Sequence, residues 1–388
     1  MIILLIEVRN LNVNTEIKSI KELLNIIKSS SAKVFIVGHN NPDLDSLASA
    51  IGLQTLCEYL GKEAYIVVNE SETTIEPIAK KVRDANVSAH NIIDLAGFEC
   101  LMDDDSTLIV TDTNKRENVA VKEYLDAFQN IIIIDHHNPG PTTIQNASTY
   151  IPIIPEQEQS KTDPKVRVSS ASEIVAQLLL QADVKCDKDV YTYLYGGIYL
   201  DTNRFDKNVG ESTHKITHKL CSRGADTTAV KELFLADFDE DKVISNLVFN
   251  GTIMKAYAFD AFNNYTIAFT LNREQPNTIY RRETIAKSAD KMMQYRIEGA
   301  FAMGYIDERT IAVSARSRGR IDVRKIMECI GGGGNSQNAA TQLDGIPITA
   351  IEDILSVIIT DKGLMVDGEV ITPVESAVIS EPIQYIKK

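Results

Sequence analysis

Aspartate and histidine side chains follow three apolar runs in the first half of the chain, each at the point where the run ends. Singly, each has an ordinary explanation, because aspartates after strands often cap helices and buried histidines often form hydrogen bonds in a core. Together they are harder to explain, since so many acidic and imidazole groups in one place would repel one another or lose hydration unless a cation lay between them. These residues are His39, Asp43, Asp45, Asp112, Asp135, His136 and His137.

The types of these side chains indicate which metal would bind. Carboxylate and imidazole groups without a thiolate suit Mn²⁺, with Mg²⁺ as the alternative and Zn²⁺ less well matched. Two cations are needed to bind so many carboxylates. Such a pair, about 3.5 to 4 Å apart, would hold a bridging hydroxide for in-line attack on phosphorus and would neutralise charge on the phosphoryl oxygens. The sequence therefore predicts a two-metal phosphoesterase centre.

The apolar runs also predict the fold that would bring these residues together. Residues 131–134 are four consecutive isoleucines with no polar alternation, which is typical of a strand covered by helices on both faces. Runs at 34–37 and 108–110 also precede the acidic residues, and the pattern as a whole predicts an α/β domain with a parallel sheet and helices on both faces. In such sheets, ligand-binding side chains gather beyond the carboxyl ends of the strands. The helical patterns lie at 44–60, 119–128, 170–181 and 189–199.

A change of pattern in the second half of the chain predicts a second, smaller α/β domain. Three strands are expected between residues 265 and 314. The glycine run Gly331–Gly334 separates an expected helix at 323–330 from another helix expected to begin near Asn338. The expected parts are an N-terminal extension (1–31), a catalytic metal-binding domain (32–235), a linking helix (236–257) and a substrate-binding domain (258–388).

The overall composition narrows the class of partner. A formal net charge of −14 disfavours long nucleic acid, because affinity for it comes largely from Lys and Arg contacts with phosphates. The five cysteines are scattered and form no Cys-x-x-Cys pair, so we expect neither a disulfide framework nor a zinc ribbon, and a cytoplasmic protein. The apolar opening Met1–Ile6, which we interpret as a strand or docking tail, is shorter than the ~20 residues of a membrane span, so we expect no membrane segment in this chain.

Several short motifs carry a resemblance to a known family. Four of them occur in the first domain in the order found in the DHH phosphoesterases, and two more resemble the DHH-associated substrate domain that follows it in these proteins. The resemblance extends over about residues 32–345 and is nearest to the cyclic-di-AMP phosphodiesterases of the family. The six motifs are Asn41–Asp45, Thr111–Thr113, Asp135–His137, Gly196–Thr202, Ser314–Ser317, and the glycine run followed by Asn338–Gln342.

The resemblance implies a metal role for particular residues. It places Asp112 between two Mn²⁺ ions, as a bridging ligand, and makes Asp135 a group that orients the neighbouring histidines. The other ligands of the first ion would be His39 and Asp43, and those of the second would be Asp45, His136 and Asp201.

The resemblance also implies how substrate would be held. His137 would face the scissile phosphate, and Arg316 together with the amides of the glycine run would hold the nucleotide, because glycines let the backbone come close to phosphate. The remaining expected substrate contacts come from the second domain and are Ser317, Gly331, Gly332, Gly333, Gly334, Asn335 and Asn338.

The chain departs from the family pattern beside the expected substrate site. Asn335 and Asn114 stand where the family often has histidine, and Asn138 and Pro139 stand where it has basic residues. None of these four is an expected metal ligand. The departures therefore leave the metal site complete and make the preferred substrate the open question.

The resulting hypothesis is a manganese-dependent phosphodiesterase that hydrolyses cyclic di-AMP to linear pApA. One alternative within the family is an oligoribonuclease that also removes phosphate from adenosine 3',5'-bisphosphate. An alternative of another class is a nucleotide-binding sensor that does not hydrolyse its ligand. The departures from the family pattern at Asn335 and Asn114 favour this alternative. In each case the partner is a small cyclic or linear nucleotide, and the chain could also form a homodimer.

Overall fold

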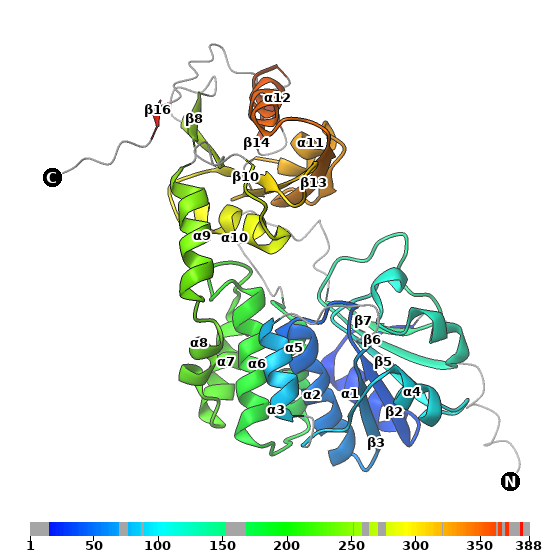
Figure 1. The fold of residues 1–388 in the computed structure, drawn as a ribbon. Coiled ribbons are helices and arrows are strands. Elements are labelled where there is room, and N and C mark those ends of the chain that lie inside the picture. The colour runs from blue at the N-terminus through cyan, green and yellow to red at the C-terminus, as the bar shows by residue number, and fades with distance from the viewer. Residues whose placement is uncertain are drawn as a thin grey trace, which may run out of the picture. The chain divides into compact units, whose positions relative to one another are not determined.

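The structure is a computed structural model, and it describes most of the chain in two compact units, residues 1–235 and 236–388 (Figure 1). The apolar opening Met1–Ile6 lies outside the described residues. The described residues are 15–69, 77–86, 89–152, 168–250, 252–257, 264–270, 277–319, 321–361, 364–366, 369–371 and 381–382.

A parallel sheet forms the centre of the first unit, as the sequence predicts. Its strand order is β1-β7-β6-β5-β2-β3-β4, and every neighbouring pair is parallel. The isoleucine run lies in β6, between β5 and β7, and is buried. The strands are β1 (Thr15–Glu16), β2 (Lys33–Val37), β3 (Glu63–Val67), β4 (Ile92–Ile93), β5 (Thr107–Thr111), β6 (Asn130–Ile134) and β7 (Ser148–Tyr150).

Helices cover both faces of this sheet. Alternate residues of β6 point to opposite faces: Ile132 and Ile134 join a core with α1, α2 and α5, whereas Ile131 and Ile133 pack with α4 and a short 3₁₀ helix, Lys122–Ala127. Helix α2 is buried all round over 44–54, since it lies between the sheet and helices α5 and α6. The helices are α1 (Ile20–Ser29), α2 (Leu44–Tyr59), α3 (Pro77–Asn86), α4 (Leu95–Leu101), α5 (Ala171–Gln181), α6 (Lys188–Asp201), α7 (Glu211–Ser222) and α8 (Thr227–Leu233).

Two expectations for the first unit were wrong. The α-helix expected at 119–128 is instead the 3₁₀ helix η2 (Lys122–Ala127), because the backbone at Val119 forms a bridge with His39; another 3₁₀ helix, η1 (Arg116–Asn118), precedes this bridge. Residues 15–31 are more than an extension of the domain. They add β1 to the sheet and bury Leu23, Leu24 and Ile27 of α1 in its core.

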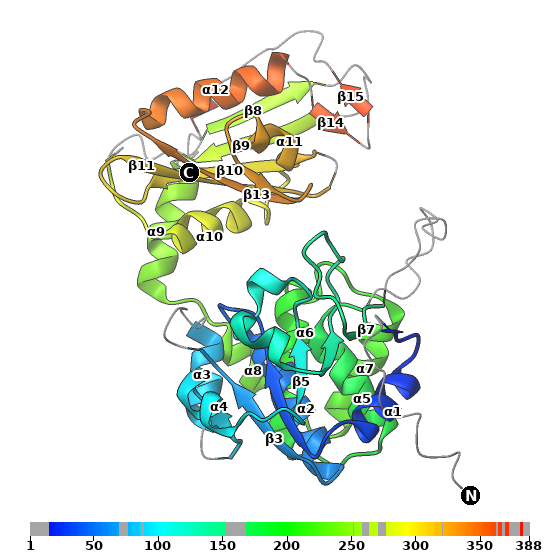
Figure 2. The same ribbon diagram turned by 90° about the vertical axis from the view of Figure 1, so that its right-hand side faces the viewer.

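The second unit is built on a mixed sheet whose strand order is β12-β13-β11-β10-β9-β8-β16. Only β9 and β10 pair in parallel among the described pairs of this sheet. Helices α9 and α10 pack on one face, and α11 and α12 pack on the other (Figure 2). Its elements are α9 (Phe238–Phe249), β8 (Thr252–Tyr257), β9 (Asn264–Thr270), α10 (Arg282–Met292), β10 (Gly299–Tyr305), β11 (Thr310–Ser317), α11 (Val323–Glu328), β12 (Gly333–Gly334), β13 (Asn338–Asp344), α12 (Ile348–Asp361), β14 (Leu364–Val366), β15 (Glu369–Ile371) and β16 (Glu381–Pro382).

The second unit also corrects two expectations. The linking helix expected over 236–257 ends at Phe249, and the rest of that stretch enters the sheet as β8. The segment after the glycine run is strand β13 and not a helix, because it fills the place beside β11 in the sheet and alternates between buried and more exposed side chains. No helix among the described residues is both long enough and apolar enough to cross a membrane.

Candidate metal centre

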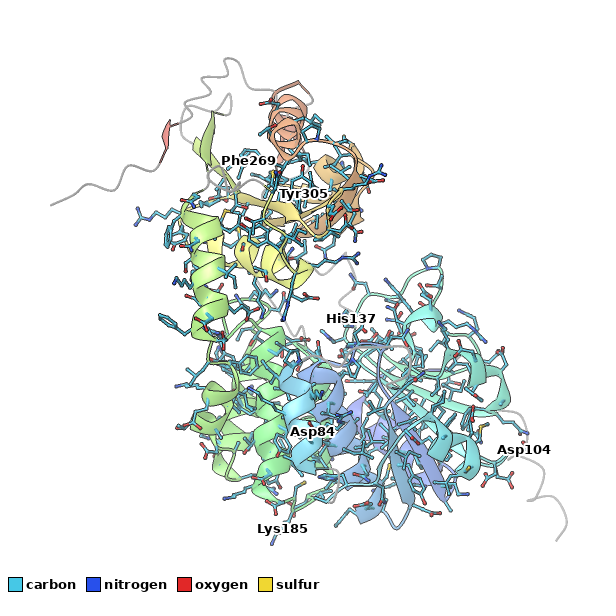
Figure 3. All side chains as sticks on the ribbon, in the orientation of Figure 1. Asp84, Asp104, His137, Lys185, Phe269 and Tyr305 are labelled. Atoms are coloured by element: carbon cyan, nitrogen blue, oxygen red, sulfur yellow. The ribbon has the colours of Figure 1, made fainter. Side chains whose placement is uncertain are left out.

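The side chains that the sequence singled out meet at the carboxyl end of the parallel sheet in the first unit. His39 follows β2, Asp112 follows β5, and the segment 135–137 follows β6. Figure 3 labels His137 at this end of the sheet. Helices α2 and α6 supply the other side chains: Asp43 is the N-cap of α2, Asp45 lies in its first turn, and Asp201 is the last residue of α6.

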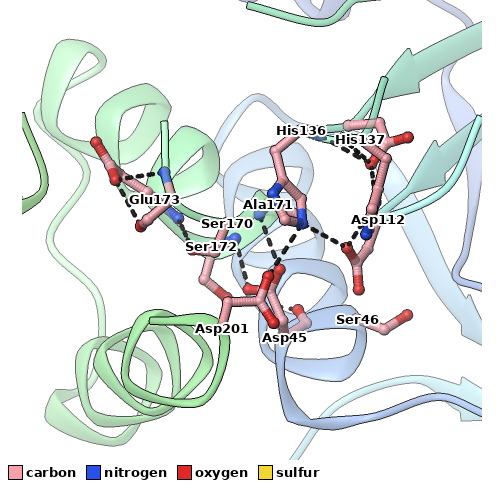
Figure 4. Close-up of polar contacts among 12 residues, drawn as sticks. Asp45, Ser46, Asp112, His136, His137, Ser170, Ala171, Ser172, Glu173 and Asp201 are labelled. Carbon is pink, nitrogen blue, oxygen red and sulfur yellow. Dashed lines mark hydrogen bonds and ion pairs between the residues drawn. The ribbon is translucent and has the colours of Figure 1, made fainter. Parts of the chain in front are cut away.

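Three groups of potential ligand atoms among the described residues share Asp112, and one of them joins it to Asp135, His136 and His137. In each group the atoms lie within 4.8 Å of one another. One Asp112 oxygen, Oδ2, lies 3.4 Å from His39 Nε2, and the other, Oδ1, lies 3.4 Å from His136 Nε2 (Figure 4). The other two groups are His39, Asp43 and Asp112, and Asp45, Asp112, His136 and Asp201. These are the same two sets that the family resemblance implies.

The centre of the cluster fits a cation. Asp112 Oδ1 and His136 Nε2 are both buried and make no hydrogen bond of good geometry among the described residues, although they lie 3.4 Å apart and His136 Nε2 lies 3.0 Å from Asp201 Oδ2. Buried polar atoms are normally satisfied, so such a pair facing each other indicates a site for a ligand that both can bind. Asp112 also has a φ of 60°, in the left-handed region, and its amide donates to the Ile134 carbonyl at 3.0 Å. Carboxylate and imidazole atoms in this arrangement suit Mn²⁺ or Mg²⁺.

The electrostatics of the cluster point the same way. Burial alone would raise the pKa of Asp112, but contacts with His136 and His39 outweigh burial and hold the pKa well below its usual range. Burial would lower the pKa of His136, yet Asp112 and Asp201 raise it to about 11. Burial and the charges of Asp112 and Asp201 raise the pKa of Asp43 to about 7. Protons on His136 and Asp43 thus balance the charge where a divalent cation would otherwise do so.

Asp45 is held by the start of another helix. Its Oδ2 accepts the Ala171 amide at 2.8 Å, and its Oδ1 accepts the Ser172 amide at 2.9 Å, both in the first turn of α5. Helix α6 also passes close to it, because a Cβ added at Gly197 would lie 2.7 Å from Asp45 Oδ1 and 2.2 Å from Ser172 Oγ. Any side chain at position 197 would therefore displace Asp45 or α5.

The buried carboxylate of Asp135 orients His137. Asp135 Oδ1 accepts the backbone amides of His136 and His137 at 2.8 and 3.2 Å, and lies 2.8 Å from His137 Nδ1. An ionised carboxylate only accepts, so Nδ1 carries the proton and Nε2 is left for a ligand. Asn114 Nδ2 donates to Asp135 Oδ2 at 2.6 Å and to the His137 carbonyl at 3.1 Å. Since the His137 side chain is 56% exposed, its ring can reach a substrate.

Comparison with known families agrees with the geometry. Residues 33–198 match the DHH family, N-terminal domain, and residues 264–360 match the DHHA1 domain. The chain belongs to the DHH family. It therefore consists of a DHH domain in the first unit and a DHHA1 domain in the second.

The matching relatives extend this comparison across both domains. The chain is 31% identical over 350 residues to the cyclic-di-AMP phosphodiesterase GdpP of Geobacillus thermodenitrificans, a match covering 88% of this chain and 49% of the relative. It is 28% identical over 335 residues to GdpP of Bacillus subtilis, covering 85% and 48%. The chain thus spans about half the length of these relatives.

Two further comparisons concern the DHH domain and the fold. A probable manganese-dependent inorganic pyrophosphatase of Streptococcus thermophilus is 29% identical over 171 residues, or 44% of this chain and 48% of that protein. The crystal structure of an exopolyphosphatase-related protein from Bacteroides fragilis superposes with a TM-score of 0.64 at 17% identity, covering 87% of this chain and 96% of that one. The second match confirms the fold.

In the DHHA1 domain, Arg316 is already paired within the chain. It lies in β11, and its Nε and Nη2 donate to the two carboxylate oxygens of Asp290 in α10, at 2.7 and 3.4 Å. Its Nη1 donates to the Ala315 carbonyl at 3.1 Å. Asp290 is 60% exposed, so this ion pair lies at the domain surface. A substrate anion would bind the remaining N–H groups of Arg316 or replace Asp290 as its partner.

The glycine run closes helix α11 and begins strand β12. The Gly331 amide donates to the Glu328 carbonyl at 3.2 Å, and the Gly332 amide donates to the Met327 carbonyl at 2.8 Å. Gly331 has a φ of +77°, as is usual just beyond a helix, and Gly334 has a φ of +143°. Two of the four amides are therefore engaged with α11, and the other two glycines pair with Ala340 and Ala339 of β13.

Asn335 and Asn338 belong to the β12–β13 hairpin. Asn335 Oδ1 accepts the Asn338 amide at 2.8 Å, and the Asn335 amide donates to the Asn338 carbonyl at 2.7 Å, so Asn335 is an exposed turn residue. Asn338 pairs with Arg316 across the β11–β13 register. Ser317 is buried, and its Oγ accepts the Gly319 amide at 3.0 Å. Arg316 and Asn338 are thus neighbours, whereas Ser317 has a role within the turn.

Two residues near the metal centre were missed or misread in the sequence. Asn114 counted only as a departure from the family pattern, yet its side chain is buried and bonded to Asp135. Glu173 was not singled out. A signal for it was present, since a serine followed three residues later by glutamate at a helix start is a capping-box pattern.

Proposed function

We propose that this chain is a manganese-dependent phosphodiesterase that hydrolyses cyclic di-AMP to linear pApA. The observation that carries the proposal is the pair of ligand groups sharing Asp112 at the end of the DHH-domain sheet. It is supported by the similarity to proteins named as cyclic-di-AMP phosphodiesterases, which extends through both domains. The Mn²⁺ preference is supported by the donor atoms and by the manganese-dependent relative of the DHH domain.

In this proposal the DHH domain binds two divalent cations. Bound there, they would activate water as the nucleophile and neutralise the charge that develops on the phosphoryl oxygens. Asp112 is the shared ligand, because each of its oxygens faces one histidine. The remaining ligands are His39 and Asp43 in one group, and Asp45, His136 and Asp201 in the other.

His137 acts on the substrate phosphate in this proposal. Its Nδ1–H donates to the buried Asp135, which keeps Nε2 free and oriented. A positioned imidazole of this kind can donate a hydrogen bond or a proton to a phosphoester oxygen. Asn114 supports the arrangement from the far side of Asp135, because it bonds the second carboxylate oxygen.

The DHHA1 domain holds the nucleotide in this proposal. Arg316 is the cation for a substrate phosphate, since a guanidinium binds phosphate with two parallel hydrogen bonds. The Gly333 and Gly334 backbone and Asn338 lie on the neighbouring strands β12 and β13. Substrate binding then exchanges Asp290 for a phosphate group as the partner of Arg316.

A substrate comparison tests the proposal. Purified protein with Mn²⁺ would be assayed on cyclic di-AMP, pApA and adenosine 3',5'-bisphosphate, with Asp112→Asn as the inactive control. We expect cyclic di-AMP to be opened to pApA at the highest kcat/KM. Faster turnover of pApA or adenosine 3',5'-bisphosphate would replace the proposal with the oligoribonuclease alternative. Binding without turnover of any of the three would identify a sensor.

A further inference from the structure

Glu173 is a fully buried carboxylate that lies outside the two ligand groups. The proposed reaction does not use it. It lies in the first turn of α5 and has 0% exposure. Both of its oxygens are satisfied. The Ser169 amide, the Ser169 hydroxyl and the Thr213 hydroxyl donate to Oε2 at 3.0, 2.7 and 2.9 Å, and Ser212 Oγ and Gln177 Nε2 donate to Oε1 at 2.6 and 3.4 Å.

These hydrogen bonds join the starts of two helices. Ser212 and Thr213 are in the first turn of α7, whereas Ser169 precedes the N-cap of α5. The N-cap Ser170 is itself bonded, since its Oγ accepts the Glu173 amide at 3.1 Å. Glu173 therefore fixes the first turn of α5 against α7, in both position and rotation.

That first turn of α5 is also what holds the metal-binding side chain Asp45. The amides of Ala171 and Ser172 donate to the two Asp45 oxygens, and these two residues lie between Ser170 and Glu173 in the chain (Figure 4). A shift of the turn would carry both amides with it and rotate the Asp45 carboxylate. Gly197 allows no compensating movement toward α6, because the space beside it is already filled by Ser172 and Asp45.

We propose that Glu173 is a positioning residue of the metal centre, which orients Asp45 through the amides of α5. The inference rests on the proposed metal-binding function. A buried carboxylate is a poor way to gain stability, because its desolvation cost is large even when it is hydrogen-bonded. The buried carboxylate does fix the relative position of α5 and α7, since its two oxygens need hydrogen-bond donors in defined places. Groups that orient metal ligands in this way typically change metal affinity 10- to 100-fold when removed.

The test compares Glu173→Ala with Glu173→Gln, measured by Mn²⁺ titration of the full chain followed by electron paramagnetic resonance. We expect Glu173→Ala to weaken Mn²⁺ binding by about tenfold or more and to lower kcat more than it raises KM. Glu173→Gln should restore most of the affinity, since its oxygen can accept from Ser169 and Thr213 while its NH2 group donates to the Ser212 hydroxyl and to the Gln177 side-chain oxygen once that amide flips. Circular dichroism and thermal melting would verify that the variants are folded.

Asn86→Ala is the matched control. Asn86 is buried and its Nδ2 donates to the Val82 carbonyl and to the Tyr193 hydroxyl, so its loss costs buried hydrogen bonds without touching α5. We expect lower stability and unchanged Mn²⁺ affinity. If Asn86→Ala weakened Mn²⁺ binding as much as Glu173→Ala, the effect would be general destabilisation and the inference would be overturned.

The remaining outcomes separate this inference from the proposed function. Wild-type Mn²⁺ affinity in folded Glu173→Ala overturns the positioning role alone. Mn²⁺ binding by wild type without cleavage of cyclic di-AMP overturns the proposed substrate alone. If Glu173→Ala does not fold, the double variant Ser212→Ala, Thr213→Val removes the two donors from α7 and takes its place in the titration. Unchanged Mn²⁺ affinity in that variant would also overturn the inference.

Discussion

The DHH domain and the DHHA1 domain differ in how their candidate binding groups are satisfied. In the DHH domain, the buried atoms Asp112 Oδ1 and His136 Nε2 make no hydrogen bond of good geometry among the described residues, and His136 Nε2 is close only to acidic oxygens of the cluster. In the DHHA1 domain, Arg316 is paired with Asp290, and the amides of Gly331 and Gly332 are bonded to α11. The first region therefore contains buried atoms that a cation would satisfy, whereas the candidate groups of the second region already have partners within the chain.

The largest effect is expected from Asp112→Asn. Removing the charge of the side chain common to both ligand groups should reduce kcat/KM by more than about 100-fold, because even groups that only orient metal ligands cost 10- to 100-fold. Mn²⁺ titration should show weaker binding at both positions. Full activity in this variant would rule out the proposed two-metal site.

Arg316→Ala tests the other side of the comparison. Loss of a hydrogen-bonded charge should raise KM for cyclic di-AMP about 10- to 100-fold while leaving Mn²⁺ affinity unchanged. Asp290→Ala should lower KM or leave it unchanged, since it frees the guanidinium for substrate. The exposed Arg309, paired with Asp344 at 3.6 Å in the same domain, supplies the control Arg309→Ala. An unaltered KM in Arg316→Ala would remove this residue from the substrate site.

The pKa of Asp43 predicts how metal binding depends on pH. Its pKa is raised to about 7, so the metal-free protein is stabilised below the usual carboxyl pKa and loses that stability as pH rises toward 7. A cation needs the ionised carboxylate, and we expect the ionisation of Asp43 to contribute about a tenfold rise in Mn²⁺ affinity between pH 6 and pH 8, in addition to the effect of the proton that His136 must release. Asp43→Asn, which keeps the helix cap, should bind Mn²⁺ more weakly and with a shallower pH dependence. An equally steep profile in that variant would assign the effect to other groups.

The smallest effect is expected in the glycine run. Gly334→Ala should destabilise the protein by about 1–3 kcal/mol, because the residue has a φ of +143° and a Cβ there would lie 2.3 Å from the Asn338 carbonyl oxygen. Gly333→Ala meets no atom within 4 Å and should leave the melting temperature unchanged. A rise in KM in Gly333→Ala, without loss of stability, would therefore report substrate contact at the run. Equal melting temperatures for the two variants would contradict the hairpin geometry.

Much of the DHH domain could be predicted from sequence, because its signals are local. The four isoleucines of β6 can only form a strand buried on both faces, and the rule that ligands lie beyond parallel strands then places Asp112 near His136. Asp201 was predicted as a ligand from the family motifs. The rule about strand ends would not have predicted it, because Asp201 lies at the end of helix α6. The structure brings all of these side chains into the two ligand groups.

What could not be predicted depends on contacts between distant segments. Val119 reads as part of a helix, but its backbone pairs with His39, 80 residues earlier. Residues 338–344 form a strand because their backbone pairs with β11. Their own sequence does not reveal this pairing. The same holds for Arg316, whose partner Asp290 lies 26 positions away in another element.

The shared position of Asp112 has a thermodynamic consequence for the proposed two-cation site. A side chain that serves both positions makes them energetically coupled, so an ion at one changes the affinity at the other by a fixed factor. Linkage requires this factor to be the same in both directions. Mn²⁺ titration should therefore deviate from two independent binding curves. A ligand that removes one ion would change how tightly the second is retained.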